Sequence, residues 1–84
     1  MTDVKIGRVT HYYDKIGVAV VELTDALSVG DKIKFTRGGE DLFEQEVSSM
    51  QIEHERVEIA KAGQTVGLKA DQGVKDAAEV YKVS

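Results

Sequence analysis

The fold is decided by residues 31–40, which run DKIKFTRGGE. Apolar and polar side chains alternate here, so Ile33 and Phe35 point to one face of an extended chain and their neighbours to the other. Such alternation is typical of a strand with one face in the core and one in water. The pair Gly38–Gly39 follows directly, and two glycines suit the tight primed turn of a β-hairpin. The stretch therefore predicts a half-buried strand that enters a hairpin.

Further strands are expected on both sides of this hairpin, because valine and other β-branched residues dominate the apolar positions. We predict strands over residues 4–13, 17–23, 31–37, 65–70 and 79–83. Glycines recur between these segments, and a glycine can take the positive φ angle that a tight turn requires. The predicted turn glycines are Gly17, Gly30, Gly38, Gly39 and Gly63.

The segment 40–62 fits two structures. Its large apolar residues are spaced close to a helical period, and Gly63 would then follow the helix as its C-cap. In a strand, Val47 has the opposite parity to Met50, so a bulge near Ser48–Ser49 is needed to bring both to one face. The pattern alone favours neither helix nor strand.

The length of 84 residues suits one domain, and we treat residues 1–84 as a single domain. Hydrophobic residues make up 42% and charged residues 31%, which is ordinary for a globular protein. No apolar run is long enough to cross a membrane, and the first residues lack the basic and apolar parts of a secretion signal. The absence of cysteine excludes disulfides and thiolate chemistry. We therefore expect a cytoplasmic protein that does not bind membranes.

Four ordered segments resemble a known family. They are residues 6–9 (IGRV), 27–35 (LSVGDKIKF), 47–52 (VSSMQI) and 60–68 (AKAGQTVGL). In this order they resemble the second domain of elongation factor Tu and related translation GTPases. No single segment is specific, but the series extends over residues 6–83.

The resemblance implies an all-β fold, namely a small closed six-stranded β-barrel with Greek-key-like connections. It also implies that residues 43–54 form a strand and that residues 57–62 form a short turn or a helical hairpin. The same type of barrel occurs at the C-terminus of collagenase-like peptidase relatives, so the barrel does not carry one function. The phosphate-binding loop of the GTPases is absent from this chain, and we expect no bound nucleotide or other cofactor. The family's aminoacyl-tRNA pocket does not map onto this chain and is not carried over.

Basic and aromatic residues on two predicted strands are the candidates for nucleic-acid binding. Aromatic rings can stack on bases while cations contact phosphates. The candidate residues are Arg8, His11, Tyr12, Lys32, Lys34 and Arg37. The alternative is that one tyrosine packs in the core and that the lysines keep a sheet face soluble. A net charge of −4 counts against phosphate contacts, which need a basic surface.

No residues are predicted to be catalytic or to bind a metal. Residues 53–56 (EHER) resemble half of a His-Glu-x-x-His motif, but Glu58 stands where the second histidine is required. No serine lies in a Gly-x-Ser-x-Gly elbow. We therefore predict no metal site and no enzymatic activity.

The favoured function is that of a stand-alone, non-catalytic and monomeric binding module. Its partner would be RNA, such as tRNA or ribosomal RNA, or a protein of the translation machinery. The alternative is a protein-interaction subunit that complements a larger enzyme, such as a collagenase-like peptidase relative. The acidic charge favours the alternative, and the two differ in salt response because phosphate contacts weaken steeply as salt rises.

Overall fold

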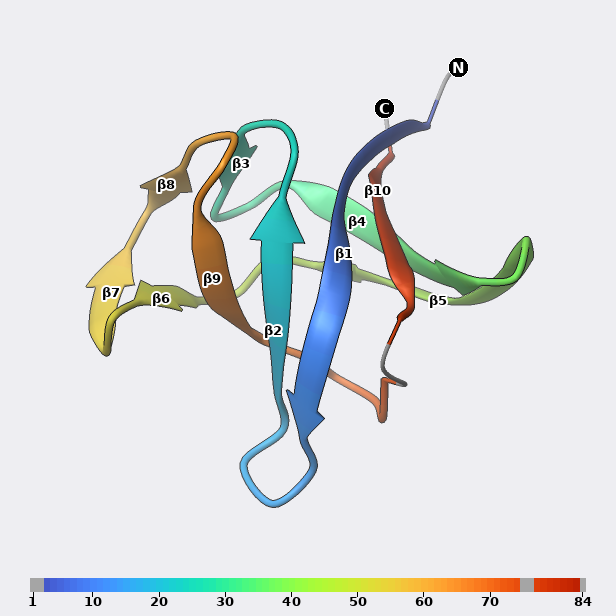
Figure 1. The fold of residues 1–84 in the computed structure, drawn as a ribbon, viewed down its shortest axis with the longest axis horizontal. Coiled ribbons are helices and arrows are strands. Elements are labelled where there is room, and N and C mark those ends of the chain that lie inside the picture. Colours follow the sequence, from blue (N-terminus) through green and yellow to red (C-terminus); the bar gives the residue numbers. More distant parts are fainter. Residues whose placement is uncertain (1–2, 75–76, 84) are drawn as a thin grey trace.

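The chain folds into strands and turns. The computed structural model describes residues 3–74 and 77–83, and these residues contain no helix. The strands are β1 (Val4–Tyr13), β2 (Val18–Leu23), β3 (Leu27–Ser28), β4 (Lys32–Arg37), β5 (Glu40–Glu46), β6 (Met50–Ile52), β7 (Glu55–Val57), β8 (Ile59–Ala60), β9 (Thr65–Lys69) and β10 (Glu79–Lys82) (Figure 1). The all-β prediction is confirmed. No helix within the described residues has the length and apolar character needed to span a membrane.

Eight of the strands form one antiparallel sheet in the order β5-β4-β10-β1-β2-β9-β6-β7, and β3 pairs with β8 in a second, two-stranded sheet. Consecutive strands form the hairpins β1–β2, β4–β5 and β6–β7, whereas β10 enters between β1 and β4. Figure 1 shows the β1–β2 hairpin extending beyond the other strands at its turn. This hairpin therefore presents its tip to solvent.

The large sheet curls around the core but stays open, so the prediction of a closed six-stranded barrel is wrong in strand number and in closure. The sheet ends at β5 and β7, and no ladder joins these strands within the described residues. The physical reason is that the chain leaves strand geometry at residues 47–49, which separates β5 from β6. Backbone hydrogen bonds to other parts of the chain hold this break in place. The Val47 N–H donates to the Asp31 carbonyl over 2.8 Å, and the Lys69 N–H donates to the Ser49 carbonyl over 3.3 Å.

A buried glutamine joins two segments that no ladder connects. The Gln45 side chain is 5% exposed. Its Nε2 donates to the Lys69 carbonyl over 2.7 Å, and its Oε1 accepts the Asp71 N–H over 2.7 Å. Because both ends of the amide are satisfied, burial of this polar group is compensated. Gln45 thus links β5 to the end of β9 across the opening of the sheet.

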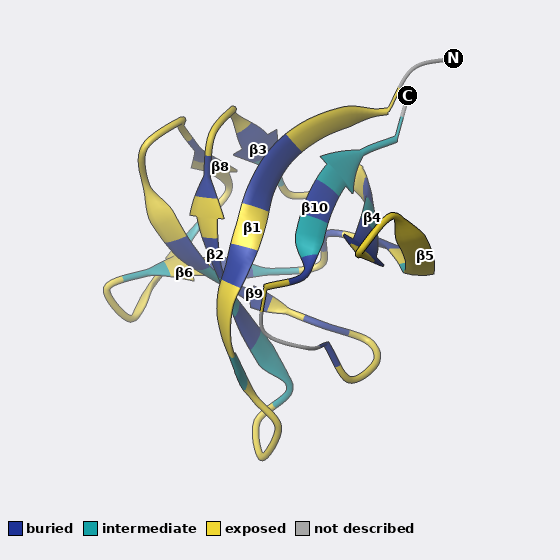
Figure 2. Ribbon diagram, turned by 45° about the vertical axis from the view of Figure 1, so that its right-hand side comes forward, coloured by how far each residue is buried: buried dark blue, intermediate teal, exposed yellow. Residues whose placement is uncertain are grey.

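The interior is one apolar core made by the inner faces of both sheets. Its buried members are Ile6, Val9, Ala19, Val21, Leu23, Leu27, Ile33, Phe35, Val47, Met50, Ala60, Val66, Leu68, Ala70, Val74, Ala78 and Val80. Burial alternates along the central strands, as the banding of Figure 2 shows. On β2, Ala19 and Val21 are fully buried, while Val18 and Val20 are half-buried on the outer face. The outer face of β2 is therefore also apolar.

The ambiguous segment 40–62 forms short strands joined by turns and breaks. The helix alternative is wrong, and so is the helical hairpin expected over residues 57–62, because β8 lies there and pairs with β3. The break at residues 47–49 does what the predicted bulge was expected to do, since it allows both Val47 and Met50 to be fully buried. Strand pairing thus outweighs the helical spacing of the sequence.

All five predicted turn glycines lie at positive φ. Gly30 has a φ of 97° between β3 and β4, and its N–H donates to the Val47 carbonyl over 2.9 Å. A side chain at this position would be strained by the backbone conformation. The turn at Gly30 therefore sets the entry into β4.

Candidate functional site

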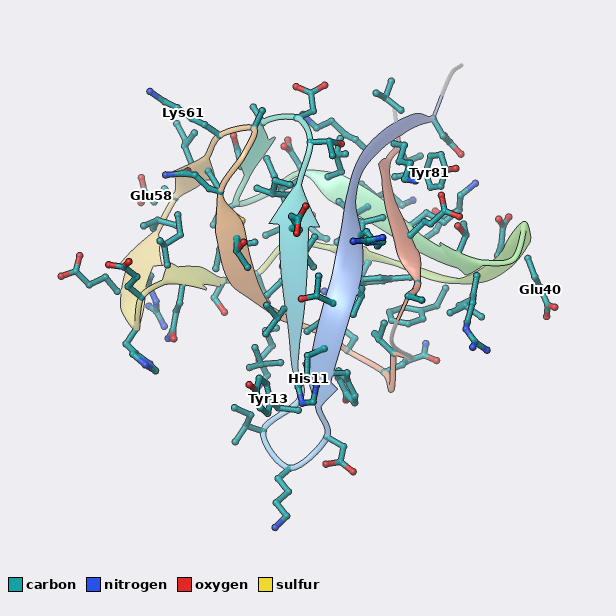
Figure 3. All side chains as sticks on the ribbon, viewed as in Figure 1. His11, Tyr13, Glu40, Glu58, Lys61 and Tyr81 are labelled. Carbon is teal, nitrogen blue, oxygen red and sulfur yellow. The ribbon has the colours of Figure 1, made fainter. Side chains whose placement is uncertain are left out.

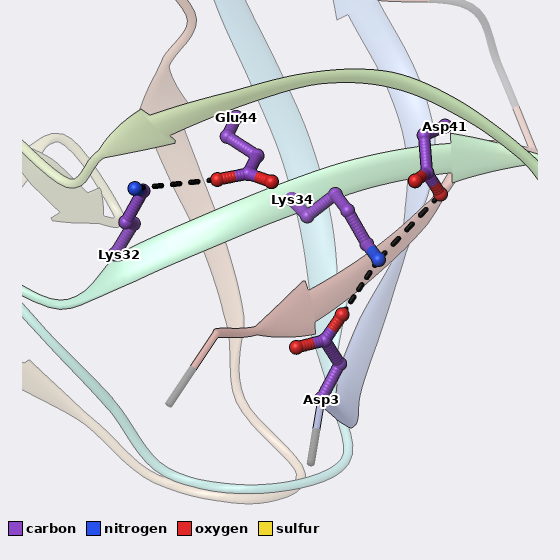
Figure 4. Close-up of polar contacts among 5 residues, drawn as sticks. All are labelled: Asp3, Lys32, Lys34, Asp41 and Glu44. Atoms are coloured by element: carbon purple, nitrogen blue, oxygen red, sulfur yellow. Dashed lines mark hydrogen bonds and ion pairs between the residues drawn. The ribbon is translucent and has the colours of Figure 1, made fainter. Parts of the chain in front are cut away.

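The two lysines predicted to bind nucleic acid on β4 are engaged with carboxylates. Lys32 Nζ lies 3.3 Å from Glu44 Oε1 on the neighbouring strand β5. Lys34 Nζ lies 2.6 Å from Asp3 Oδ2 and 3.5 Å from Asp41 Oδ1 (Figure 4). The hydrogen bond to Asp3 is the main cause of a raised pKa for Lys34. Protein carboxylates therefore already stand where a phosphate would have to bind.

These contacts belong to a larger surface, which we call the ion-paired face. It consists of the residues in or next to β1, β4, β5 and β10 that form ion pairs: Asp3, Lys5, Asp31, Lys32, Lys34, Asp41, Glu44, Glu79 and Lys82. Lys5 Nζ lies 2.8 Å from Glu79 Oε2, and this hydrogen bond holds the pKa of the Glu79 carboxyl below its ordinary range. Cations and carboxylates alternate across this face.

The remaining predicted residues lie apart from the β4 lysines. Arg8 is exposed on β1, directly between Glu22 of β2 and Glu79 of β10 in the strand register. Arg37 is exposed at the end of β4, opposite Glu40. Both arginines therefore have acidic neighbours. Strand β10 separates Arg8 from β4, so the sheet does not place the two basic groups on adjacent strands.

The two aromatic candidates on β1 have different surroundings. Tyr12 is half-buried and packs against the core. His11 is exposed, and its ring meets the edge of Tyr13 with 4.3 Å between the ring centroids (Figure 3). Of these residues, His11 and Tyr13 are more exposed than Tyr12.

A hollow with an apolar floor lies elsewhere, on the outer face of β1, β2, β9 and β6. We call it the β2–β9 groove, a hollow of about 310 Å³ lined by Tyr13, Ile16, Val18, Val20, Gln51, Glu53, His54, Thr65, Val66 and Gly67. Val18 and Val20 form its floor beside Gly67, which pairs with Val20 in the ladder and has no side chain to fill the space. A methyl group on Gly67 would lie 3.3 Å from Val18 Cγ1. The lack of a side chain at this position thus keeps the groove open.

One wall of the groove continues into the tip of the β1–β2 hairpin. Tyr13 is 49% exposed and Ile16 is 62% exposed, although both are large and apolar. A second hollow, of about 420 Å³, lies at the tip and is lined by residues 11–16. The two hollows share Tyr13 and Ile16, so they form one continuous surface.

The opposite wall is a strained turn. Glu53 and His54 connect β6 to β7 as a two-residue hairpin loop, closed by the pair Ile52 and Glu55. Their φ angles are 51° and 67°, which is the geometry of a type I′ turn. Asn-Gly suits this turn, whereas most other residues with a Cβ are disfavoured at positive φ. The rim of the groove therefore carries two residues with a strained backbone.

The groove has the composition of a binding surface. Within the described part of the chain, no group of three or more His, Cys, Asp or Glu side chains is placed to hold a metal ion. The groove instead offers a valine floor, an exposed aromatic ring and a rim of amide, carboxylate and imidazole groups. Such a mixture of apolar surface and a few polar groups is common in ligand-binding sites.

The residues that line the groove are not among the site residues predicted from the sequence. The available signal was the apolar run over residues 18–21, which exceeds what one buried face of a strand requires. The positive φ angle of Glu53 had no sequence signal, because glutamate is not a residue type enriched at positive φ.

We compared the chain with known proteins by family, sequence and structure. No family model matches it. A protein of Methanocaldococcus jannaschii described as an uncharacterized protease is 42% identical over 78 residues. That match covers 93% of this chain but 19% of the other protein, so the chain spans about a fifth of the length of this relative.

Among solved structures, the chain superposes on the C-terminal domain of a Geobacillus thermoleovorans protein assigned to the U32 peptidases. The TM-score is 0.88 at 20% identity, over 96% of this chain and 93% of that chain. The selenomethionine variant of the same domain gives a TM-score of 0.83 at 20% identity, over 90% and 95% of the two chains. The likeness shows a shared fold.

The predicted membership of the translation-factor family is wrong. The relatives are a protease-like protein and a U32 peptidase C-terminal domain, and they are not elongation factors. The physical reason is that the matching segments form strand starts and tight turns, such as the turn at Gly30. Those features follow from backbone geometry and recur in unrelated β-domains.

Proposed function

We propose that this chain is a non-catalytic, monomeric binding module that works with a U32-peptidase-like catalytic unit. It contributes a protein-binding surface, while the partner contributes the reacting groups. This proposal adopts the alternative function of the sequence analysis and sets aside the translation role.

The observation that carries the proposal is the domain-sized match to a much longer protease-like protein. A segment equal to 19% of that protein corresponds to nearly the whole of this chain. The fold match to a C-terminal domain of a U32 peptidase supports the same assignment.

The distribution of charge supports a protein partner over RNA. The lysines of β4 face carboxylates at 2.6–3.5 Å, and Arg8 lies between two glutamates in the ladder. A phosphate backbone approaching this surface would meet negative charge as well as positive. The β2–β9 groove offers apolar surface of the kind that forms the centre of protein interfaces.

A binding measurement tests the proposal. The Methanocaldococcus jannaschii relative is prepared without the 78-residue segment that matches this chain, and the chain is titrated into it by calorimetry. We expect a complex with a Kd of about 1 μM or tighter, the range of specific protein interfaces. The affinity should change little between low and moderate salt, because the interface has an apolar centre.

Two controls complete the experiment. The intact relative already carries its own copy of the segment, so it should bind the added chain much more weakly. Bulk tRNA replaces the protein in a parallel titration. Absence of a complex with the shortened relative would contradict the proposal, as would salt-sensitive binding to tRNA alone.

A further inference from the structure

We propose that the β2–β9 groove docks an extended protein segment that presents one large apolar side chain next to a lysine or arginine. The identity of the partner rests on the proposed function, but the chemistry of the docked segment rests on the groove itself. Three features of the groove carry this inference.

The first feature is the apolar floor. Val18 and Val20 are half-buried on the outer face of β2, and Gly67 leaves open space beside them. Tyr13 and Ile16 extend the apolar surface while remaining 49% and 62% exposed. A hollow of about 310 Å³ can accept one large aliphatic or aromatic side chain. Burying such a side chain would remove these exposed apolar groups from water.

The second feature is the charge of the lining. Of the described residues that line the groove, Glu53 is the one with a formal charge at neutral pH when histidine is neutral. A cation beside the apolar anchor would complement this exposed carboxylate. A phosphate or a carboxylate next to Glu53 would be repelled. Lys69 and Arg56 stand opposite Val18 and Gln51 in the ladders, away from Glu53. Glu53 therefore favours a cation at its own end of the groove.

The third feature is the strained turn that carries Glu53. Both Glu53 and His54 have positive φ, although glycine or asparagine would relieve the strain. Strained conformations of this kind are concentrated at functional sites, where the side chain is needed in a fixed position. The hairpin β6–β7 holds Glu53 at the groove rim and so fixes the place of the incoming cation.

The aromatic pair at the tip completes the site. His11 and Tyr13 meet edge to face at 4.3 Å, which restrains the Tyr13 ring beside the groove. Tyrosine is enriched among the residues that dominate binding energy at interfaces. Tyr13 would cover one side of the docked side chain.

The first test uses peptides, so that it does not depend on the identity of the partner. The ¹⁵N-labelled chain is titrated with an acetylated hexapeptide Gly-Ser-Phe-Lys-Ser-Gly and with matched peptides that carry Phe-Glu or Ala-Lys at the centre. We expect amide shifts at residues 13–20, 51–54 and 65–67 with the Phe-Lys peptide. Affinity should fall about fivefold for each matched peptide.

The charge preference should disappear in Glu53→Gln, which keeps the shape of the side chain. Absence of groove shifts with the Phe-Lys peptide would overturn the proposal, and so would equal binding of the Phe-Glu peptide. Groove shifts that grow with protein concentration in the absence of peptide would also overturn it, because the occupant would then be a second copy of the chain.

The second test uses a matched pair of isoleucines and the shortened relative. Ile16 is 62% exposed at the groove, and Ile59 is 63% exposed on β8, in the other sheet. We expect Ile16→Ala to weaken binding about tenfold, as for an interface anchor, and Ile59→Ala to leave the Kd unchanged. The reverse order would overturn the groove as the docking site.

The two tests separate this inference from the proposed function. Peptide binding in the groove without binding of the shortened relative would support the groove and contradict the proposed partner. Binding of the relative that is weakened by Ile59→Ala and unaffected by Ile16→Ala would support the partner and contradict the groove.

Discussion

The ion-paired face and the β2–β9 groove are two regions of one curled sheet, and they treat their outer side chains in opposite ways. On the ion-paired face, cations and carboxylates alternate, and the Nζ–O distances run from 2.6 to 3.6 Å. In the groove, valines line the floor and an exposed isoleucine stands on the wall. One region is electrostatically satisfied, while the other retains apolar surface and backbone strain.

This difference indicates which of the two surfaces should be tested for binding. Surface ion pairs keep a sheet face soluble and contribute little to stability. An exposed apolar hollow with a strained rim has no comparable role in the isolated chain. Lysine-rich strands are therefore weaker indicators of function in this protein than the valines of β2.

The largest effect should come from the core beneath the ion-paired face. Phe35 is fully buried on β4, and its ring lies 4.9 Å from that of Phe43. Phe35→Ala leaves a cavity and should lower the free energy of unfolding by about 3–5 kcal/mol, measured by urea denaturation. Ile59→Ala is the surface control and should stay within about 0.5 kcal/mol of the wild type. A small loss of unfolding free energy for Phe35→Ala would mean that the ion-paired face is not stabilised by the core beneath it.

The second largest effect on the free energy of unfolding is expected at the strained turn of the groove. The double variant Glu53→Asn with His54→Gly supplies the residues that a type I′ turn favours. We expect the free energy of unfolding to rise by about 1–2 kcal/mol, because strain at two positive-φ residues is relieved. Binding of the Phe-Lys peptide should weaken at the same time. Increased stability with unchanged peptide binding would show that the two side chains have no binding role.

A smaller effect is expected from an ion pair. Lys34→Met keeps the aliphatic stem but removes the contacts to Asp3 and Asp41. Both carboxylates remain partly exposed and can be hydrated, so the urea midpoint should move far less than in Phe35→Ala. The difference from the wild type should shrink further in high salt. A shift as large as that of Phe35→Ala would contradict our description of this face.

The smallest effect is in the dependence of stability on pH. The Lys5 hydrogen bond lowers the pKa of Glu79 in the folded state. Its contribution is complete above the ordinary carboxyl pKa of about 4.3 and is lost as pH falls through the lower folded value. Lys34 has a raised pKa, so its contribution is complete below the ordinary lysine pKa of about 10.4 and is lost as pH rises through the folded value. Thermal melts of Glu79→Gln should therefore fall less steeply in acid than those of the wild type, and equal slopes would argue against the pair.

The fold was more predictable from the sequence than the site. The alternation around Ile33 and Phe35 identified β4, and the valine-rich segments identified β1, β2, β9 and β10, because side-chain parity follows directly from strand geometry. The open form of the sheet was not predictable. The break at residues 47–49 depends on backbone hydrogen bonds to Asp31 and Lys69, and both residues lie far from the break in the sequence.

The groove depends on relations between strands. Gly67 lies opposite Val20 only once β9 pairs with β2, and Glu53 reaches the rim only once β6 pairs with β9. The family resemblance failed for a related reason, since turn and strand motifs encode geometry that several protein families share.

The surface that we propose to meet the partner is the groove and not the ion-paired face. The most direct measurement maps the amide shifts of the ¹⁵N-labelled chain in complex with the shortened Methanocaldococcus jannaschii relative. We predict shifts and line broadening at residues 13–20, 51–54 and 65–67. Shifts centred on residues 32–46 instead, or on neither region, would contradict docking of the partner in the groove.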